Sequence, residues 1–451
     1  MRNIFFFCLS LGWASIAAAQ SNPGFTIQLE DSGNAIAPKL QSYCLAASGG
    51  KILLFGGRIN GFHGTSDMES TFPSQYSNRY FWVLDPINQK SWKADLPAGF
   101  KYQLSSTNME FFQDDDVLYC IGGYGSQCDQ DSASCYQTFP NLTSIRVTAL
   151  MNAIISGQTS NLGQYITSIT DERMRVTGGS LKKLGDWFYL CFGHNYYTMY
   201  KGGVTGIYTE QIRKFKIQNS GTSLSITNYQ TYTDPTNLQP QSEFHRRDLN
   251  VVETIMPDGT NGLTAYGGVF TQYGSAWFHP ISVYQSASGV TTNKVDTSFN
   301  QKFNLYDCAS ISMYDKVTKN MYTSMLGGIT FYYYDKNGNL EPSNGLNFMP
   351  FSNNLTTLVR GSNGKTVEYP QQSPALPGYI GSNAVFVPAP NIPMYSTGGS
   401  HDIIDLNIIP TGIPVLIGYM YGGIMATADQ SSEFNPTFAS SKIYNVYLTR
   451  N

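Results

Sequence analysis

Short apolar runs that end in glycine recur along the chain, and each is followed by a polar loop. Lys51-Ile-Leu-Leu-Phe-Gly56-Gly57 and Val117-Leu-Tyr-Cys-Ile-Gly122-Gly123 show the pattern most clearly. Runs this short, rich in aliphatic and aromatic residues, predict buried β-strands, and the glycines predict a sharp bend after each strand. The doublets or their near equivalents begin at Gly56, Gly122, Gly193, Gly267, Gly327 and Gly422.

The spacing of the doublets is roughly 70 residues, which predicts one repeated unit of supersecondary structure. In the first unit the pattern predicts four strands, over residues 43–48, 51–55, 79–84 and 91–95. Pro86 and its polar neighbours form the turn between the last two. Residues 145–155 fit either a helix or a strand, because their apolar positions are also β-branched.

The repeated glycine doublets resemble those of the kelch family of β-propellers. The first unit adds Val83-Leu-Asp85-Pro86 and, after it, Trp92, which is similar to the end of a kelch repeat. Kelch repeats are usually about 50 residues long, so the loops here are expected to be enlarged. The resemblance implies an all-β fold, a six-bladed kelch-like β-propeller, with seven blades as the alternative.

The two ends of the chain are expected to meet. The last unit stops after a third strand at residues 443–448, while residues 25–30 form an alternating strand without a unit of its own. We therefore expect the N-terminal strand to complete and close the last blade, which removes an exposed sheet edge. Residues 378–412, before the last doublet, are expected to hold one strand at 383–387 and a long loop rather than a seventh blade.

The first 19 residues are typical of a signal peptide, with Arg2, an apolar stretch and the small residues Ala17 to Ala19. A retained membrane anchor is the alternative, although the apolar run is short for a membrane span. Residues 20–451 are then expected to form a single domain that is secreted, either extracellular or periplasmic. In such a compartment, the polar loop between Cys128 and Cys135 predicts a local disulfide.

The amino-acid composition limits the classes of binding partner that can be expected. Charged residues make up 13% of the chain and the formal net charge is −3, which disfavours a nucleic-acid partner or electrostatic attachment to lipid. Aromatic residues reach 14%, which suits strands and half-exposed binding surfaces. The cysteine and histidine spacing predicts no metal site, no motif predicts a cofactor, and the chain is expected to be a monomer.

Ligands of kelch-like propellers usually bind at the mouth of the central channel. The loops after the doublets and the loops that lead into the first strand of each unit are expected to line this mouth. This resemblance implies a set of candidate ligand-binding residues from several units. They are Arg58, His63, His194, Tyr196, His245, Arg246, Arg247 and Tyr306.

The run from His245 to Asp248 is the densest part of this set. His245 and Arg246 are predicted to face a ligand, with arginine suited to a carboxylate or to a sulfated or acidic sugar. Arg247 and Asp248 are predicted to hold the channel wall, because Asp307 stands at the matching place in the next unit. His194 replaces the second glycine of its doublet, which marks either a site or a degenerate repeat.

Three functions remain open at this point. The first is a non-catalytic module that binds a glycan or an exported protein through its channel face. The second is a sugar-processing enzyme, an epimerase or mutarotase similar to sialate-processing kelch proteins, that uses His and Arg at the mouth. The third is a structural module for surface assembly, since a fold does not determine a function.

Overall fold

The computed structural model of the chain is built almost entirely of β-strands, with only short helices. It describes residues 22–62, 72–129, 131–200, 206–236, 238–271, 274–286, 289–334, 337–343, 349–371, 373–395, 402–430 and 436–451. The predicted signal peptide and His63 therefore lie outside the described residues. In the described part, no helix has the length and apolar character needed to cross a membrane.

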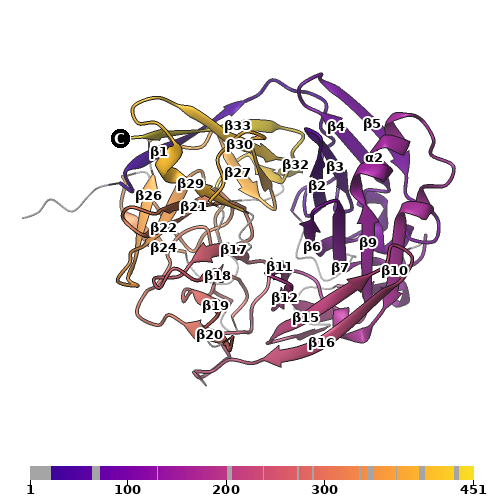
Figure 1. Cartoon of the computed structure of the whole chain (residues 1–451), viewed down its shortest axis with the longest axis horizontal. Coiled ribbons are helices and arrows are strands. Elements are labelled where there is room, and N and C mark those ends of the chain that lie inside the picture. Colours follow the sequence, from indigo (N-terminus) through magenta and orange to yellow (C-terminus); the bar gives the residue numbers. More distant parts are fainter. Residues whose placement is uncertain are drawn as a thin grey trace, which may run out of the picture.

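The larger sheets follow one another in chain order around a common centre (Figure 1). The first contains β2 (Cys44–Ser48), β3 (Lys51–Phe55), β4 (Tyr80–Asp85) and β5 (Lys90–Asp95). The second contains β6 (Thr107–Asp114), β7 (Val117–Ser126), β8 (Tyr136–Thr138), β9 (Asn141–Arg146) and β10 (Ile166–Thr170). The third contains β11 (Ser180–Leu184), β12 (Trp187–Cys191), β15 (Ile212–Asn219) and β16 (Leu224–Tyr232).

The next three large sheets are also built mainly of antiparallel strands. The fourth contains β17 (Asn250–Ile255), β18 (Asn261–Tyr266), β19 (Ile281–Gln285) and β20 (Thr291–Val295). The fifth contains β21 (Ala309–Asp315), β22 (Asn320–Leu326), β25 (Leu355–Arg360), β26 (Thr366–Gln371) and β29 (Ile403–Asp405). The sixth contains β28 (Val385–Pro388), β30 (Val415–Tyr421), β33 (Ile443–Arg450) and β1 (Phe25–Asp31).

Smaller elements fill the loops between these sheets. Short sheets are formed by β13 (His194–Tyr196) with β14 (Gly206–Tyr208), β23 (Tyr332–Tyr334) with β24 (Leu340–Pro342), and β27 (Tyr379–Ser382) with β31 (Ile424–Ala426) and β32 (Thr437–Ala439). The α-helices are α1 (Lys101–Leu104) and α2 (Val147–Ile155). The 3₁₀ turns are Ser74–Tyr76, Ala133–Cys135, Leu162–Tyr165, Glu172–Met174 and Leu406–Ile408.

Two ambiguous stretches of sequence are resolved by these assignments. Residues 145–155, compatible with helix or strand, end β9 and then form α2. The described part of residues 378–412 forms no four-stranded sheet of its own. Instead it supplies β27 to a small three-stranded sheet, β28 to the sixth sheet and β29, in parallel pairing with β21, to the fifth. The prediction of a single strand in this stretch is therefore wrong, while the absence of a seventh four-stranded sheet from the described residues agrees with it.

The two ends of the chain pair with each other, as the sequence predicted. β1 runs antiparallel to β33, from Phe25 opposite Arg450 to Asp31 opposite Tyr444. Its inward residues, Phe25, Ile27 and Leu29, are buried in a core shared with the fifth sheet. The N-terminal strand therefore covers the edge of the C-terminal strand and joins two parts of the core.

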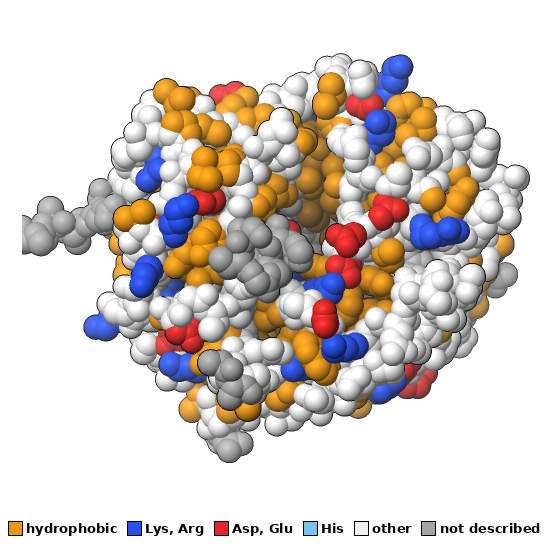
Figure 2. Space-filling model, in the orientation of Figure 1, with side chains coloured by type: hydrophobic (Ala, Val, Ile, Leu, Met, Phe, Trp, Pro, Cys, Tyr) orange, Lys and Arg blue, Asp and Glu red, His pale blue; other side chains and the backbone are white. Residues whose placement is uncertain are grey.

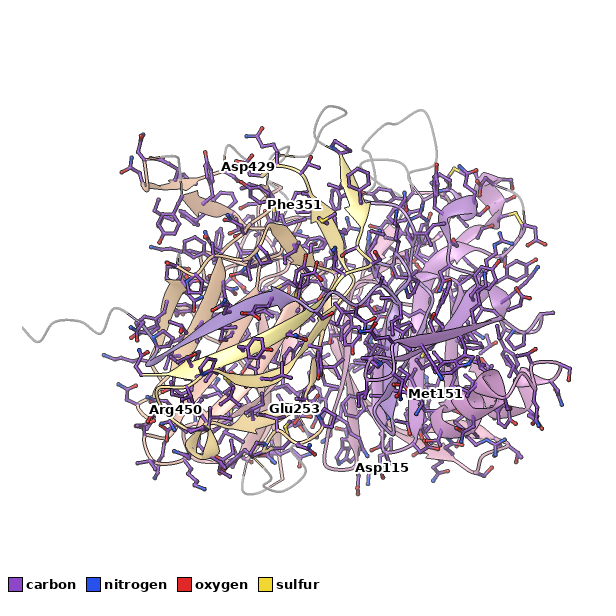
Figure 3. The ribbon with its side chains drawn as sticks, turned by 90° about the horizontal axis from the view of Figure 1, so that it is seen from above. Asp115, Met151, Glu253, Phe351, Asp429 and Arg450 are labelled. Atoms are coloured by element: carbon purple, nitrogen blue, oxygen red, sulfur yellow. A yellow bond between two sulfur atoms is a disulfide. The ribbon has the colours of Figure 1, made fainter. Side chains whose placement is uncertain are left out.

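Hydrophobic cores lie between neighbouring sheets. One core joins Phe55 of β3 to Cys120 of β7, and another joins Tyr189 of β12 to Val251 of β17. In the view turned by 90° from Figure 1, Phe351 and Asp429 lie toward one end of the molecule, and Asp115 and Glu253 lie toward the opposite end (Figure 3). Layers of antiparallel sheets that share cores in this way form an all-β architecture compatible with a β-propeller.

The glycine doublets occur where one sheet meets the next. Gly122 has a φ of +65°, and a Cβ atom at this position would lie 1.9 Å from the carbonyl oxygen of Val176. Gly327 likewise has a φ of +72° and would place a Cβ 2.0 Å from the carbonyl oxygen of Ile380. Both glycines thus combine a left-handed backbone with contact to the chain that enters the next sheet, which is why a side chain is excluded.

Candidate functional site

A belt of residues at the start of the innermost strands forms the floor of the candidate site. The first of the hydrogen bonds that link them runs from the backbone N–H of Asn108 to the carbonyl of Ser42 (3.2 Å). The last runs from the N–H of Asn383 to the carbonyl of Asp307 (2.9 Å). The links between them measure 3.3, 2.7 and 3.0 Å. We call this set the central belt; its members, one at or just before the innermost strand of each large sheet, are Ser42, Asn108, Gly178, Asp248, Asp307 and Asn383.

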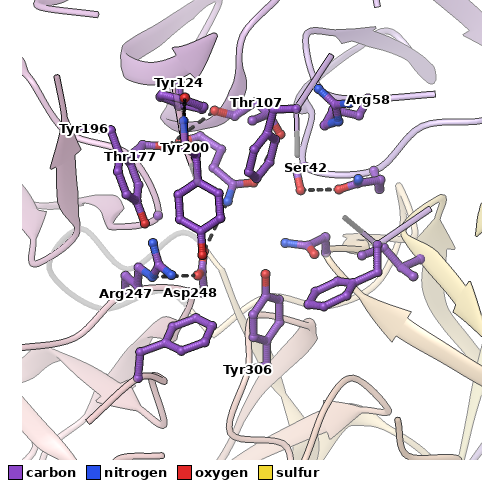
Figure 4. Close-up of a pocket in the computed structure, with 18 residues that line it drawn as sticks. Ser42, Arg58, Thr107, Tyr124, Thr177, Tyr196, Tyr200, Arg247, Asp248 and Tyr306 are labelled. Carbon is purple, nitrogen blue, oxygen red and sulfur yellow. Dashed lines mark hydrogen bonds and ion pairs between the residues drawn. The ribbon is translucent and has the colours of Figure 1, made fainter. Parts of the chain in front are cut away.

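A narrow cavity lies against the central belt on the side of the glycine-doublet loops (Figure 4). Residues just after the doublets, such as Arg58 and Tyr124, form part of its wall, as the sequence predicted for these loops. The lining combines two arginines, four tyrosines and one carboxylate. Its residues are Gln41, Ser42, Arg58, Phe62, Phe72, Thr107, Asn108, Tyr124, Thr177, Gly178, Tyr196, Tyr200, Arg247, Asp248, Phe270, Tyr306, Asn383 and Ile424.

A wider cavity lies on the other side of the belt and is lined mainly by the innermost strands β2, β6, β11, β17, β21 and β28. Figure 2 shows a hollow near the middle of one face of the molecule, with hydrophobic side chains in its depth and acidic ones beside it. Ser42, Asn108, Gly178, Asp248 and Asn383 line both cavities. The belt is thus the narrow point between two hollows in the centre of the molecule.

Arg247 is the cation at the wall of the narrow cavity. Its Nε lies 3.5 Å from the Asp248 carboxylate, and its Nη1 lies 3.4 Å from Nδ1 of His194. Its guanidinium carbon lies 4.3 Å from the ring centre of Phe270 and 5.4 Å from that of Tyr196. Burial lowers the pKa of Arg247 from its usual value, because little water surrounds the charged guanidinium.

His194 stands behind Arg247 in a stack of rings. Its ring lies 4.1 Å from that of Tyr196 and 4.3 Å from that of Tyr208, centre to centre. Burial, followed by the charge of Arg247, lowers the pKa of His194 to about 3. A neutral imidazole can then accept a hydrogen bond from Arg247 through Nδ1. The side chain that replaces a glycine of the doublet therefore contacts Arg247 rather than lining the cavity itself.

Tyr208 continues the stack towards His245. The two rings are 3.6 Å apart, and Nδ1 of His245 forms a short contact with the Glu210 carboxylate. His245 was predicted to face the ligand, but it is not among the residues that line the cavity. Its contacts instead tie the β14 segment to the chain that leads into β17.

Arg246 lies inside the protein, although the sequence favoured it as a ligand contact. Its side chain has no exposed surface, pairs with Glu243 and donates from Nη1 to the carbonyl of Gly267 at 2.9 Å. Its guanidinium carbon also lies 5.3 Å from the ring centre of Trp277. Arg246 and Arg247 are neighbours in the chain, but only Arg247 lines the cavity.

Two other predicted residues do line the cavity. Arg58 is buried, donates from Nε to Asn60 at 3.0 Å and lies over Phe72, with its guanidinium carbon 5.1 Å from the ring centre. Burial lowers the pKa of Arg58 to about 10. Tyr306 is also buried, and its hydroxyl group points toward the middle of the cavity (Figure 4).

The sequence did not single out several residues of this site. Asn108, Tyr200, Phe270 and Asn383 line the cavity with the predicted set. A signal for two of them was present, since Asn108 and Asn383 hold the same place as Asp248 at the start of an innermost strand. Tyr200 and Phe270 lie in irregular loops, where the sequence carries no comparable mark.

Two carboxyl groups of the belt are held in unfavourable surroundings for a charge. Burial raises the pKa of Asp248, although Arg247 opposes the shift. Burial and the nearby Asp248 raise the pKa of Asp307 to about 7. Asp248 accepts a hydrogen bond from Asn108 at 3.1 Å, and Asp307 accepts one from Asn383 at 3.2 Å. Asp307 is therefore partly protonated at neutral pH.

The cysteines form one disulfide and several free thiols in the described structure. A disulfide joins Cys128 to Cys135, the pair that the sequence proposed. Cys44, Cys120, Cys191 and Cys308 are buried free thiols. Across the described ranges, no three side chains of His, Cys, Asp or Glu come together in a way that would hold a metal ion.

A buried glutamate on β6 should make the stability of the protein depend on pH. Burial raises the pKa of Glu110 to about 8 from an ordinary value of 4.5. The folded state therefore holds a proton that the unfolded state releases between these two values, so stability should fall as pH rises from 4.5 to 8. One such group contributes a slope of about 1.4 kcal/mol per pH unit.

Replacing Glu110 with glutamine should make this slope shallower in urea denaturation measured at several pH values. The hydrogen bond from the Gly179 N–H, at 2.7 Å, can still be accepted by the amide oxygen. Glu30→Gln, on the exposed face of β1, is the matched control and should leave the slope unchanged. An unchanged slope in Glu110→Gln would mean that Glu110 is ionised in the folded protein.

Comparison with known proteins assigns no family to the chain. No family model matches the chain, and no curated protein matches it. Among solved structures, one titled "Structure of YjhT" aligns with a TM-score of 0.46 and 11% sequence identity, over 89% of this chain and 97% of that one. A likeness at this level assigns neither a family nor an activity to the chain.

Proposed function

We propose that the chain is a six-bladed kelch-like β-propeller, exported through its N-terminal segment. The order of the large sheets and the repeated glycine doublets support this proposal. The belt adds a second line of support, because its hydrogen bonds link successive sheets at one common level. On this proposal β1 completes the last blade, and the belt encircles the axis of the propeller.

We further propose that the protein binds a glycan in the narrow cavity, as a non-catalytic module. The observation that carries this function is the lining of the cavity, where tyrosine rings surround two arginines and several amide side chains. Tyrosine rings can stack on the apolar faces of sugars, while arginine and amide groups can bind their oxygen atoms. A site for an exported protein would need a broader surface than this narrow cavity offers.

A sugar-processing enzyme is the second candidate, and the belt carboxyl groups are the observation that favours it. Asp307, with a pKa of about 7, lies next to Asp248 in the belt, and Asp248 lines the cavity. A carboxyl group whose pKa is near neutral can donate or accept a proton at neutral pH. Release of a changed sugar by the wild type, but not by Asp248→Asn, would favour this candidate over a binding module.

A glycan array tests the binding function, with the wild type compared to Tyr306→Phe. This variant removes one hydroxyl group from the cavity and keeps the ring, so binding should weaken by about 3- to 10-fold, the value of one hydrogen bond. Tyr197→Phe is the matched control, because Tyr197 is 57% exposed and lies outside the cavity lining. If no glycan binds the folded wild type, the glycan function is incorrect.

A further inference from the structure

Two hydrogen-bond donors at the narrow cavity are buried without a hydrogen-bond partner in the described structure. One is the hydroxyl group of Tyr196, a residue that is 5% exposed. The other is Nε of Arg247, which has only the long 3.5 Å ion pair with Asp248. A buried donor without an acceptor is costly, so a ligand that supplies the acceptor gains that energy on binding.

The Tyr196 hydroxyl group and the Arg247 guanidinium lie close together at the wall of the cavity. In Figure 4 the hydroxyl end of Tyr196 is directed at Arg247, and the guanidinium carbon lies 5.4 Å from the Tyr196 ring centre. They come from separate segments, β13 and the chain before β17. A group placed between them could accept from both at once.

The charge of the cavity favours an anion. Among the described residues of the lining, Arg58 and Arg247 are the two cations and Asp248 is the one carboxylate. Asp248 also accepts from Asn108 at 3.1 Å, so it keeps a partner when Arg247 turns to a ligand. The cavity therefore carries an excess of positive charge in surroundings that exclude water, where charge-assisted hydrogen bonds are strongest.

His194 holds Arg247 in place behind the cavity. Its Nδ1 lies 3.4 Å from Nη1 of Arg247, and its ring is fixed between Tyr196 and Tyr208. Gly206 lies against the other ring nitrogen, where a Cβ atom would come within 3.0 Å of Nε2. The imidazole therefore cannot turn away, and Arg247 keeps one nitrogen toward His194 and the rest of its guanidinium toward the cavity.

We propose that Arg247 and Tyr196 form a subsite for the carboxylate of an acidic sugar, with His194 as its positioning residue. This rests on the proposed glycan function and names the class of glycan. A carboxylate is planar and offers two oxygens, one for each donor, and its plane can align with that of the Arg247 guanidinium. We expect a tetrahedral sulfate group to bind less tightly, since it has no such plane.

Matched sugars on an array test the subsite: galacturonate against galactose, glucuronate against glucose, and a sulfated galactose. The wild type should bind each acid at least 10-fold more tightly than its neutral partner, and more tightly than the sulfated sugar. Tyr196→Phe should weaken acid binding by about 3- to 10-fold and leave neutral sugars unchanged. Arg247→Met should abolish the preference for the acid.

The positioning role of His194 has its own readout. His194→Asn keeps an acceptor for Arg247 and should retain most of the preference, whereas His194→Phe keeps only the ring and should lose it. Arg79→Met, at an exposed arginine outside the cavity, is the control for each substitution. Equal effects of His194→Asn and His194→Phe would overturn the positioning role.

The outcomes separate the subsite from the wider function. Equal binding of acidic and neutral sugars would overturn the carboxylate subsite and leave the glycan function standing, and preference for the sulfated sugar would also overturn it. If no array glycan binds, the glycan function fails. Free galacturonate in a thermal-shift assay then decides the subsite, which requires stabilisation of the wild type that Tyr196→Phe and Arg247→Met reduce.

Discussion

Replacing Arg246 with alanine should destabilise the protein by about 3–5 kcal/mol, the usual cost of removing one partner of a buried ion pair. The Glu243 carboxylate, with a 7% exposed side chain, would lose its cation, and the carbonyl of Gly267 would lose its donor at 2.9 Å. His279 Nδ1, 2.7 Å from the other Glu243 oxygen, would remain as the nearest partner. Urea denaturation followed by circular dichroism measures the loss.

A double mutant separates two parts of this stability loss, the cost of the unpaired Glu243 carboxylate and the cost of the lost Arg246 packing. Glu243→Gln in the Arg246→Ala background should recover part of the stability, because no buried charge then remains. Arg79→Ala is the control, since Arg79 and Asp129 form an exposed ion pair worth at most about 1 kcal/mol. A loss of less than 1 kcal/mol in Arg246→Ala would show that Arg246 is not the buried structural cation described above.

Replacing Ile27 with aspartate should prevent stable folding. Ile27 is 1% exposed, and its neighbours in the core come from β1, β33 and the fifth sheet. Burial of an isoleucine side chain is worth about 1.5–3 kcal/mol, and an unpaired carboxylate in its place adds a penalty of several kcal/mol. The sum is comparable to the whole stability of a typical domain.

The neighbouring residue supplies the control for this effect. Gln28 lies on the exposed face of the same strand, so Gln28→Asp should change the stability by less than about 1 kcal/mol. Thermal unfolding of the two variants gives the comparison. Similar melting temperatures for Ile27→Asp and the wild type would mean that β1 does not contribute to the core, and the proposed closure would lose its support.

The sequence predicts the strands of this protein well because its signals are local. Apolar runs ended by Gly-Gly locate β3 and β22, since strand burial and the bend after it depend on a few adjacent residues. They also locate the start of β7, although this strand continues through its doublet to Ser126. The meeting of β1 with β33 was also predictable, because one end lacked a strand and the other had a spare one. The crossing of β29 to the fifth sheet was not, as it depends on contacts between segments about 90 residues apart.

The site was predicted less completely than the fold. Arg58 and Tyr196 followed from the loops after the doublets, and Tyr306 followed from the loop that leads into a first strand. Arg246 and Arg247 have the same chemistry and stand side by side, so only the direction of each side chain separates a structural residue from a cavity residue. That direction depends on the path of an irregular segment, which carries no periodic pattern.

A crystal structure of the protein with an oligogalacturonate tests the central claim most directly, namely that the narrow cavity around Arg247 binds a glycan. We predict that a carboxylate of the sugar lies within hydrogen-bond distance of the Arg247 guanidinium and the Tyr196 hydroxyl group. The sugar ring should then stack against a tyrosine of the cavity wall. A glycan bound on the outer strands, with the cavity empty, would contradict this claim.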